Sequence, residues 1–537
     1  MPATWELHAA TKVRTPPRPV AIALATCTGI LLFSAFPPLE WAWAAWVALV
    51  PLGLAVAGRR LGETSALSVW AGLVFWIPSL WWIHRVTIPG WMALSAYCAL
   101  YMIPPAWVFA ELGRRSVPSR AGGSLGSALA IAATWVGWEV VRGHLATGFP
   151  WNDLGVSQYR HWGWIQHAAW GGVPAVSVAV AFFNGLAWSW AWARMERVRP
   201  PTARAEHLLG GCLLVVAWLS GLAQLATPVA SDVELRVALV QPAVPQYEKW
   251  TPESYTRMYQ DLQRLSLAAL TMQPGLLVWP ETALPENVRE SREALALVRS
   301  VTSHGVPLVF GALDAERDND GNVRYYNAAI LMKPEPALEV YRKQHLVLFG
   351  EYVPFRSVLP VLGRLVPMDF DLTPGHTPTV FRIQQPAEIP FSTMICFEDT
   401  MAPLARRFVQ RGARWLLVLT NDAWFDGTWG HRQHFVQSIF RAVECGVPLV
   451  RCANSGVTGW VDPKGRIGGR QGEAAGTLPI TDAHGRPAAG FLTVQVPIAL
   501  AGWNPTPWVR HGPWFPWTLV CIGVTLTLVV AVIAYKT

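Results

Sequence analysis

Long apolar stretches alternate with short polar loops over the first 226 residues, and one more stretch lies at the C-terminus. About eight of them approach the ~20 residues that an α-helix needs to cross a hydrocarbon core. The pattern therefore predicts transmembrane helices at 20–36, 41–58, 65–84, 91–111, 124–142, 168–193, 206–226 and 515–535. The first stretch also has the basic flank and Ala-Phe-Pro-Pro ending of a cleaved signal peptide, but the spans that follow favour a retained helix.

The pattern changes near Asp232, where short β-rich runs begin to alternate with amphipathic helical stretches. The predicted strands are 235–241, 275–280, 307–312, 326–332, 391–396, 414–420, 447–452 and 457–461. The predicted helices are 251–270, 287–303, 400–411 and 431–445. Buried strands that read as nearly continuous apolar runs between helices are typical of an α/β sandwich. We thus expect a membrane domain of about seven helices at 1–226, an α/β domain at 227–502 and a final transmembrane helix within 503–537.

Composition and charge support a membrane protein. The chain is 52% hydrophobic, only 15% charged and contains 30 tryptophans, which fits an integral membrane protein better than a soluble one. Its net charge of +8 is concentrated in every second loop, a pattern typical of topology signals, so nucleic-acid binding is the weaker interpretation. The positive-inside rule then places the N-terminus in the cytoplasm and residues 227–513 outside it. The basic residues concerned are Lys12, Arg14, Arg18, Arg59, Arg60, Arg114, Arg115, Arg120, Arg194, Arg197, Arg199, Arg204 and Lys536.

The seven cysteines do not form a disulfide framework. Four fall in predicted spans, where cysteine behaves as a small apolar residue. Of the three in the α/β region, Cys445 and Cys452 lie in apolar segments and are expected to be buried packing residues. Cys396 is followed closely by acidic residues and is the candidate for a free, reactive thiol.

Three short motifs occur in order in the α/β region: VWPETALP, YRKQHLVLFGEYVP and STMICFED. They place Glu281, Lys343 and Cys396, which supply a general base, a fixed cation and a soft nucleophile. These three groups suffice for acyl transfer through a thioester. Glu281 can accept the proton of the thiol, which is mostly protonated at neutral pH, and Lys343 can hold the charge on the carbonyl oxygen.

Each residue alone has an ordinary structural explanation. A lysine in a polar turn is usually a solvated surface residue, and a free cysteine is usually buried packing. The three together, each interpreted as a strand end in an α/β domain, favour an active site.

These motifs resemble the carbon–nitrogen hydrolase (nitrilase) superfamily, whose Glu-Lys-Cys triad follows the same order. The stretch with Asn454, Gly456 and the 462–465 turn is also similar to that superfamily. The order of spans, nitrilase-like region and final span resembles the apolipoprotein N-acyltransferase family of the bacterial inner membrane. The segment GHLATGFPW after Arg142 is similar to the membrane half of that family.

The resemblance implies an αββα sandwich that carries a Glu281–Lys343–Cys396 triad on the periplasmic side of the inner membrane. It implies transfer of an acyl chain from a phospholipid to the N-terminal amine of a diacylglyceryl-cysteine lipoprotein, by a monomer without metal or cofactor. Further site residues carried over are Glu351, Glu398, Trp250 and Phe397, the last of which replaces the tyrosine found in many members. The alternatives are a membrane-tethered amidase or nitrilase that hydrolyses a small C–N substrate, or a transporter or scaffold with a degenerate outer domain.

Other polar and apolar features allow two interpretations. Glu139 and Arg142, three residues apart, can form a structural or a functional ion pair on one helix face. The apolar stretch Val358–Phe370 is either core or an arm that dips into lipid beside the active site.

Two motifs near the end of the α/β region also allow more than one interpretation. His431 and His434 have HxxH spacing but lack a third ligand motif, which favours capping or core roles over metal binding. Asp422 and Trp424 follow a predicted strand, and they either line the pocket or pack in the core.

Overall fold

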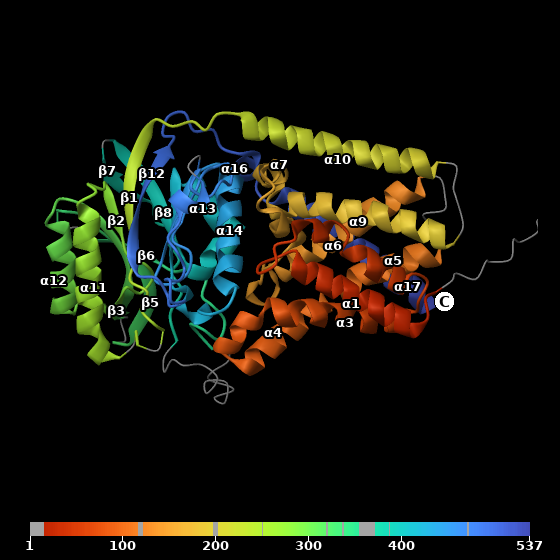
Figure 1. Ribbon diagram of the computed structural model, residues 1–537, viewed down its shortest axis with the longest axis horizontal. Helices are drawn as coiled ribbons and strands as arrows, with labels where there is room; N and C mark the ends of the chain where they lie inside the picture. The colour runs from red at the N-terminus through yellow and green to blue at the C-terminus, as the bar shows by residue number, and fades with distance from the viewer. Residues whose placement is uncertain are drawn as a thin grey trace, which may run out of the picture.

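The computed structural model describes residues 15–536 apart from 116–121, 197–201, 247, 250, 318–320, 336–337, 354–370, 386 and 470–471. A bundle of helices, the helical half, is followed by two β-sheets with their own helices, the sheet half (Figure 1). The last helix returns from the sheets and packs along α6 and α5 of the bundle.

The helical half contains α1 (Arg18–Ser34), α2 (Leu49–Val56), α3 (Leu61–Ser79), α4 (Ile88–Leu100), α5 (Ile103–Arg114), α6 (Gly123–Arg142), α7 (Trp162–Ile165), α8 (Ala168–Gly171), α9 (Val173–Met195), α10 (Ala203–Ala226) and α17 (Trp514–Lys536). Short 3-10 turns at Ala42–Trp46 (η1), Trp81–Arg85 (η2), Leu145–Thr147 (η4) and Leu154–Gln158 (η5) connect them. Among the described residues, five segments are long and apolar enough to cross a membrane: Ile88–Arg114, α6, α9, α10 and α17. The protein is therefore a membrane protein.

Four expected spans differ from single continuous helices, among them 65–84, which is divided between α3 and η2. The segment 41–58 forms η1 and the eight-residue α2, and 91–111 is divided between α4 and α5. The second break lies at Tyr101 and Met102, just before two prolines that occupy the first turn of α5, because proline cannot donate within a helix interior. Helix α9 begins at Val173 because Gly172, with φ of 70°, turns the chain after α8.

The start of α1, the end of α9, the start of α10 and the end of α17 lie at the end of the helical half away from the sheets (Figure 1). Among the described residues, these helix ends carry Arg18, Arg194, Arg204 and Lys536. Arg18 and Arg59 both pair with Glu63, at 3.1 and 3.0 Å. Arg114 donates from Nη2 to the Arg59 carbonyl at 2.8 Å. Helices α2, α3 and α5 therefore share one charged end.

The sheet half contains two sheets packed face to face. One has the order β12-β1-β2-β4-β5-β6, with β3 beside β4, and the other has the order β11-β10-β9-β8-β7. Its strands are β1 (Val233–Gln241), β2 (Leu276–Val278), β3 (Leu284–Asn287), β4 (Leu308–Arg317), β5 (Val323–Met332), β6 (Leu338–Arg342), β7 (Phe381–Gln384), β8 (Glu388–Ile395), β9 (Trp415–Thr420), β10 (Leu449–Ala453), β11 (Gly459–Val461) and β12 (Gly490–Ile498).

Helices cover the outer face of each sheet, which completes the αββα sandwich predicted as the fold class. Figure 1 shows α11 (Pro252–Leu270) and α12 (Arg292–Thr302) outside the first sheet, farthest from the helical half. Helices α13 (Ala402–Gln410) and α14 (Gly430–Cys445) cover the second sheet and face the bundle. The remaining short elements are η7 (Cys396–Thr400), η8 (Asp422–Phe425), α15 (Glu473–Gly476) and α16 (Pro507–His511).

The strand directions bring several strand ends to one edge of the sandwich. Strands β1, β2 and β4 are parallel, as are β8, β9 and β10, while β6 runs parallel to β4 because both pair antiparallel with β5. Side chains that follow β2, β6, β8 and β9 can therefore converge.

Helix α14 joins the two halves through polar contacts. Gln433 donates from Nε2 to the Pro37 carbonyl and accepts from the Trp151 indole, both at 2.9 Å. Glu444 accepts from the Val173 backbone N–H at 3.1 Å. The sheets are thus held directly on the membrane-facing helices.

Candidate active site

Glu281 lies in a tight turn directly after β2. Its side chain is 9% exposed, and Thr282 beside it has a φ of 44°, which few residues other than glycine adopt. The turn passes so close to Gly311 on β4 that a Cβ there would lie 2.6 Å from the Glu281 Cα. Gly311 is therefore required for the turn to lie against the strand.

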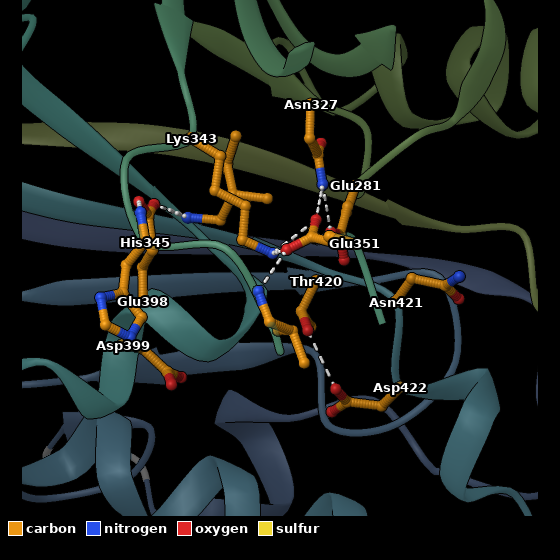
Figure 2. Close-up of polar contacts among 12 residues, drawn as sticks. Glu281, Asn327, Lys343, His345, Glu351, Glu398, Asp399, Thr420, Asn421 and Asp422 are labelled. Atoms are coloured by element: carbon orange, nitrogen blue, oxygen red, sulfur yellow. Dashed lines mark hydrogen bonds and ion pairs between the residues drawn. The ribbon is translucent and has the colours of Figure 1, made fainter. Parts of the chain in front are cut away.

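Lys343 and Glu351 meet Glu281 at this edge of the sandwich, with Asn327 above them (Figure 2). The Lys343 ammonium is 2.8 Å from Glu351 Oε2, 2.9 Å from Glu351 Oε1 and 3.7 Å from Glu281 Oε1. Asn327 donates from Nδ2 to Glu281 Oε1 at 2.7 Å and to Glu351 Oε1 at 2.9 Å. One amide thus fixes the spacing of the two carboxylates.

Lys343 remains an ammonium although it is only 1% exposed. Burial on its own would lower the pKa of Lys343, but the charges of Glu351 and Glu281 raise that pKa above its ordinary value. The site therefore holds a permanent, fixed cation.

Cys396 stands on a sharp turn between β8 and η7. Its φ of 53° is rare for a residue other than glycine, and such strain is typical of a strand-to-helix turn that exposes a nucleophile. Burial raises the pKa of the Cys396 thiol well above its ordinary value, and the Glu281 charge adds to that rise while Lys343 opposes it. The resting thiol is thus protonated and requires a base before it can attack.

Glu398 ties the cysteine turn to the lysine loop. Its carboxylate accepts from the Tyr341 hydroxyl at 2.8 Å, from the backbone N–H groups of Gln344 and His345 at 2.7 and 3.0 Å, and from that of Ile395 at 2.8 Å. Burial raises the pKa of Glu398 to about 7, although Lys343 and these N–H donors oppose the rise. Glu398 therefore sets the position of Cys396 relative to Lys343.

Phe397 extends an aromatic wall that begins in the helical half. Its ring stacks at 6.2 Å on Phe149 and at 6.4 Å on Trp151, both from the loop after α6, with interplanar angles of 12° and 11°. It also stacks on His345 of the loop that follows Lys343, at 6.1 Å. The residue after Cys396 therefore contacts the helical half through its ring, which phenylalanine retains.

A quartet of buried charges lies behind Cys396: Asp399, Asp422, His434 and Arg451. The His434 Nδ1 is 2.8 Å from Asp422, its Nε2 is 3.0 Å from Asp399, and the Arg451 Nη2 is 2.9 Å from Asp422. Burial would lower the pKa of His434, but the two aspartates raise it to about 9, so the ring is an imidazolium at neutral pH. Figure 2 shows Thr420 bonded to Asp422, at 2.9 Å.

Ligand atoms of Cys396, Asp422 and His434 lie within 4.8 Å of one another, as in a metal site. The donor set does not suit a cation, however, because both ring nitrogens already face carboxylates and Arg451 Nη2 lies 2.9 Å from Nδ1. Two aspartates and two cations already balance one another.

The sequence analysis missed two buried residues of this site. Asn327, which bridges the two glutamates, lies within an otherwise ordinary strand pattern and gave no signal. Lys249 is 1% exposed and donates from Nζ to the Glu281 carbonyl at 2.9 Å. Its position beside the predicted Trp250 was the one clue.

Most of the predicted site residues come together. Glu281, Lys343 and Glu351 form one connected network, and Glu398 bonds the backbone of the loop that follows Lys343. The charges of Glu281 and Lys343 act on the thiol of Cys396. Trp250 and the stretch Val358–Phe370 lie outside the described residues. Cys445 and Cys452 are buried free thiols, as expected.

The structure also decides between the interpretations of the Glu139–Arg142 pair and of His434. Arg142 pairs with Asp153 rather than with Glu139, whose Oε1 instead accepts from the Leu154 N–H at 2.8 Å and from the Trp135 indole at 2.9 Å. The expected ion pair on one helix face is therefore wrong, because the loop after α6 folds back and supplies the partner. His434 belongs to the buried core, as expected.

The arrangement contains the parts of an acyl-transfer site: a thiol, a carboxylate base and a cation on converging strand ends. Residues 236–483 match the family profile described as carbon-nitrogen hydrolase, and residues 28–186 match that of the apolipoprotein N-acyltransferase N-terminal domain. The fold and site thus define a carbon–nitrogen hydrolase domain of the nitrilase type, joined to membrane helices.

Relatives along most of the chain specify the family. The apolipoprotein N-acyltransferase of Geobacter metallireducens is 34% identical over 467 residues, which cover 83% of this chain and 86% of that protein. That of Methylococcus capsulatus is 33% identical over 469 residues, again 83% and 86%. The chain belongs to the apolipoprotein N-acyltransferase family, which confirms the resemblance found in the sequence.

Two solved structures are similar to part of the chain. Nit3 of Saccharomyces cerevisiae, from branch 10 of the nitrilase superfamily, has 18% sequence identity and a TM-score of 0.36. The match covers 51% of this chain and 93% of Nit3. An amidase from Nesterenkonia sp. has 18% identity and a TM-score of 0.34, over 51% of this chain and 94% of the amidase.

Proposed function

We propose that the protein transfers an acyl chain from a phospholipid to the N-terminal amine of a diacylglyceryl-cysteine lipoprotein, through a thioester at Cys396. This is the last step of lipoprotein maturation. The observation that carries the proposal is the convergence of Glu281, Lys343 and Cys396 at the face of the sheet half that contacts the membrane helices. Family membership over both halves of the chain supports it.

The first half-reaction consumes the phospholipid ester. Glu281 takes the proton of the Cys396 thiol, and the thiolate attacks the ester carbonyl, whose oxygen becomes negative. Lys343 stabilises that oxyanion. When the C–O bond breaks, the lysophospholipid oxygen takes the proton from Glu281, which leaves an acyl-thioester and an ionised glutamate.

The second half-reaction consumes the lipoprotein amine. The neutral amine attacks the thioester carbonyl, and the oxyanion again faces Lys343. Glu281 accepts a proton from the attacking nitrogen and returns it to the sulfur as the C–S bond breaks. The products are an amide and the free thiol, so the enzyme ends in its starting state and needs no metal or cofactor.

The aromatic wall supports transfer in preference to hydrolysis. Phe149 and Trp151 come from the membrane half and stack on Phe397, so the wall beside the nucleophile is apolar and continuous with the bundle. Such a surface suits acyl chains and keeps water from a thioester. A soluble amidase would not require an apolar wall that a loop of the helical half supplies.

The same proposal covers location and organisation. We place the protein in the bacterial inner membrane as a monomer, with residues 1–226 and the C-terminal helix within 503–537 in the bilayer. Residues 227–502 form the catalytic domain and face the periplasm. The support is the clustering of basic helix ends on the side opposite to the sheets.

An assay that distinguishes transfer to a peptide from transfer to water tests the activity. Purified protein in detergent receives phospholipid with a labelled acyl chain and a diacylglyceryl-cysteinyl peptide, and mass spectrometry follows the peptide. We expect an amide-linked acyl chain on the peptide amine, absent with Cys396→Ala and retained with Cys445→Ala. Release of free fatty acid without peptide acylation, or turnover of a small amide instead, would favour the hydrolase alternative.

A further inference from the structure

A second buried lysine lies behind the proposed base. Lys249 is on the segment between β1 and α11, and its side chain is 1% exposed. Its Nζ donates to the backbone carbonyl of Glu281 at 2.9 Å. An ammonium in this position contacts the turn that carries Glu281 without contacting the carboxylate.

The segment that carries Lys249 is anchored to the second sheet. The N–H groups of Ala243 and Val244 donate to the carbonyl and side-chain oxygen of Asn454, at 2.8 and 3.1 Å. The Lys249 N–H donates to the Pro245 carbonyl at 3.2 Å. Lys249 is thus held between the Glu281 turn of the first sheet and the strand ends of the second.

The two lysines of the site have different electrostatic surroundings. Lys343 makes a close ion pair with Glu351, which balances its charge. In the described part of the chain, the recorded partner of the Lys249 Nζ is a neutral carbonyl. A buried ammonium without a carboxylate partner is costly, so its retention at this point requires a compensating interaction.

We propose that Lys249 is a positioning residue for acyl transfer, which fixes the Glu281 turn and supplies a second cation for the negative charge shared by Glu281 and Cys396. The proposal rests on the proposed function only in taking Cys396 as nucleophile. Before attack the negative charge resides on Glu281, and after proton transfer it resides on the thiolate. Lys249 lies beside the Glu281 turn in both states, until the thiolate attacks and the charge passes to the carbonyl oxygen that faces Lys343.

The electrostatics of Lys249 agree with that role. Burial lowers the pKa of Lys249 to about 7, and the charges of Glu281 and Cys396 are the groups that oppose the decrease. The negative Glu281–Cys396 pair therefore favours the ammonium, which at a pKa of about 7 is lost as the pH rises above neutral. Removing the positive charge should in turn disfavour the thiolate.

Two substitutions separate position from charge. Lys249→Gln keeps a donor for the Glu281 carbonyl but removes the charge, whereas Lys249→Met removes both. The matched control is Lys333→Gln, because Lys333 pairs with Glu339 at the surface and its side chain is 34% exposed. Tryptophan fluorescence and thermal melting show which variants fold.

The readout is the rate at which iodoacetamide alkylates Cys396, measured by mass spectrometry of its peptide from pH 6 to 10 in the whole protein. This reaction reports the thiolate and needs no phospholipid, so its result stands even if the proposed activity fails. Lys249→Gln should slow labelling about tenfold near pH 6, where Lys249 is an ammonium, which corresponds to a change of about one unit in the pKa of the thiol. The difference from the wild type should shrink toward pH 10, where Lys249 of the wild type is neutral. Lys333→Gln should match the wild type.

Kinetics of thioester formation supply the second readout. Lys249→Gln should lower the maximal rate about tenfold with an unchanged KM for phospholipid, and Lys249→Met should lower it further because the turn also loses its anchor. If Lys249→Met does not fold, Lys249→Gln alone decides the question. A wild-type alkylation profile in folded Lys249→Gln would overturn the proposal.

Discussion

At the scale of single residues, the charge of Lys343 depends on Glu351. The two groups are 2.8 Å apart and nearly buried, and Glu351 is the nearest charged group to the Lys343 ammonium among the described residues. Glu351 also accepts the backbone N–H of Val347 at 2.9 Å, which holds the loop that follows Lys343. Glu351 is thus expected to act through Lys343 and not on substrate.

Glu351→Gln should therefore reduce thioester formation. Loss of the carboxylate leaves Lys343 with Glu281 as its remaining partner, at 3.7 Å, and draws the ammonium toward the base. We expect a decrease of about 10²–10³-fold in the rate of Cys396 acylation, similar to loss of one oxyanion donor. Quench-flow mass spectrometry measures it, with Glu339→Gln at the surface as control, and an unchanged rate would show that Glu351 is dispensable.

Phe397 allows a second residue-scale prediction. Its ring stacks between His345 and the pair Phe149 and Trp151, so the ring and not a hydroxyl is the feature in contact. Phe397→Tyr should keep activity within about threefold, whereas Phe397→Ala should lose most acylation from long-chain phospholipid and about 3 kcal/mol of stability. If Phe397→Ala retained full activity, the wall would have no role in donor binding.

The residues of the proposed triad were predictable because each lies in a recognisable motif, although the strand before Lys343, β6, was not predicted. Lys249 and Asn327 were not, since their importance comes from contacts with Glu281 across 32 and 46 positions of sequence. Likewise, Arg142 found its partner in Asp153 only because the loop after α6 folds back. Spacing along one helix could not show that.

At the scale of elements, the buried charge quartet joins η7, η8, α14 and β10 behind the nucleophile. His434 on α14 faces Asp399 and Asp422, and Arg451 on β10 bonds the same pair. Removing one member leaves an uncompensated buried charge, which commonly costs ~3–5 kcal/mol. The quartet therefore fixes α14 against the sheet that carries Cys396.

The quartet predicts a pH dependence of stability. The pKa of His434 is raised to about 9 by its aspartates, compared with about 6.5 in an unfolded chain. Its contribution is thus fully present below pH 6.5 and is lost as the pH rises through about 9, a change of up to about 3 kcal/mol. The pKa of Lys249 is lowered to about 7, so its effect has the opposite sign. Its contribution makes the folded protein more stable as the pH rises from about 7 toward the ordinary pKa of a lysine.

The measurement therefore compares how steeply the melting temperature changes with pH in two proteins. Thermal melts of the wild type and of His434→Gln, recorded from pH 6 to 9.5, isolate the His434 contribution because Lys249 is present in both proteins. We expect the melting temperature of the wild type to fall more steeply with rising pH than that of the variant. Parallel curves would mean that His434 is neutral in the folded protein.

Among the elements, apolar central strands and amphipathic helices were predicted well, whereas β3, β6, β7 and β12 were not. Strand β12 shows the reason: it lies at the edge of its sheet and pairs with β1 alone, so its outward positions remain polar and weaken the pattern. The span expected at 41–58 also differed, because η1 and α2 pack inside the bundle and need not cross it alone.

At the scale of the whole molecule, the two halves share the candidate site. The loop after α6 contacts Phe397, and α14 contacts the loops of the bundle through Gln433. The sequence predicted a membrane half and a catalytic half but not this shared surface, because no pattern within either half encodes contacts with the other.

The proposed orientation makes a further prediction. A reporter enzyme that is active only outside the cytoplasm should be active when fused after residue 230 and silent when fused after residue 117. The reason is that the basic helix ends favour the cytoplasmic side. The reverse pattern would place Cys396 among cytoplasmic reductants and away from exported lipoproteins.

The central claim is that Cys396 carries the acyl chain between donor and acceptor. The most direct measurement is intact mass spectrometry of the protein after incubation with a phospholipid of defined chain length, followed by addition of the diacylglyceryl-cysteinyl peptide. We predict a mass increase equal to one acyl chain, mapped to Cys396 and removed by hydroxylamine, which disappears as the peptide gains the same chain. Peptide acylation without any adduct at Cys396, or an adduct that the peptide never discharges, would contradict the account.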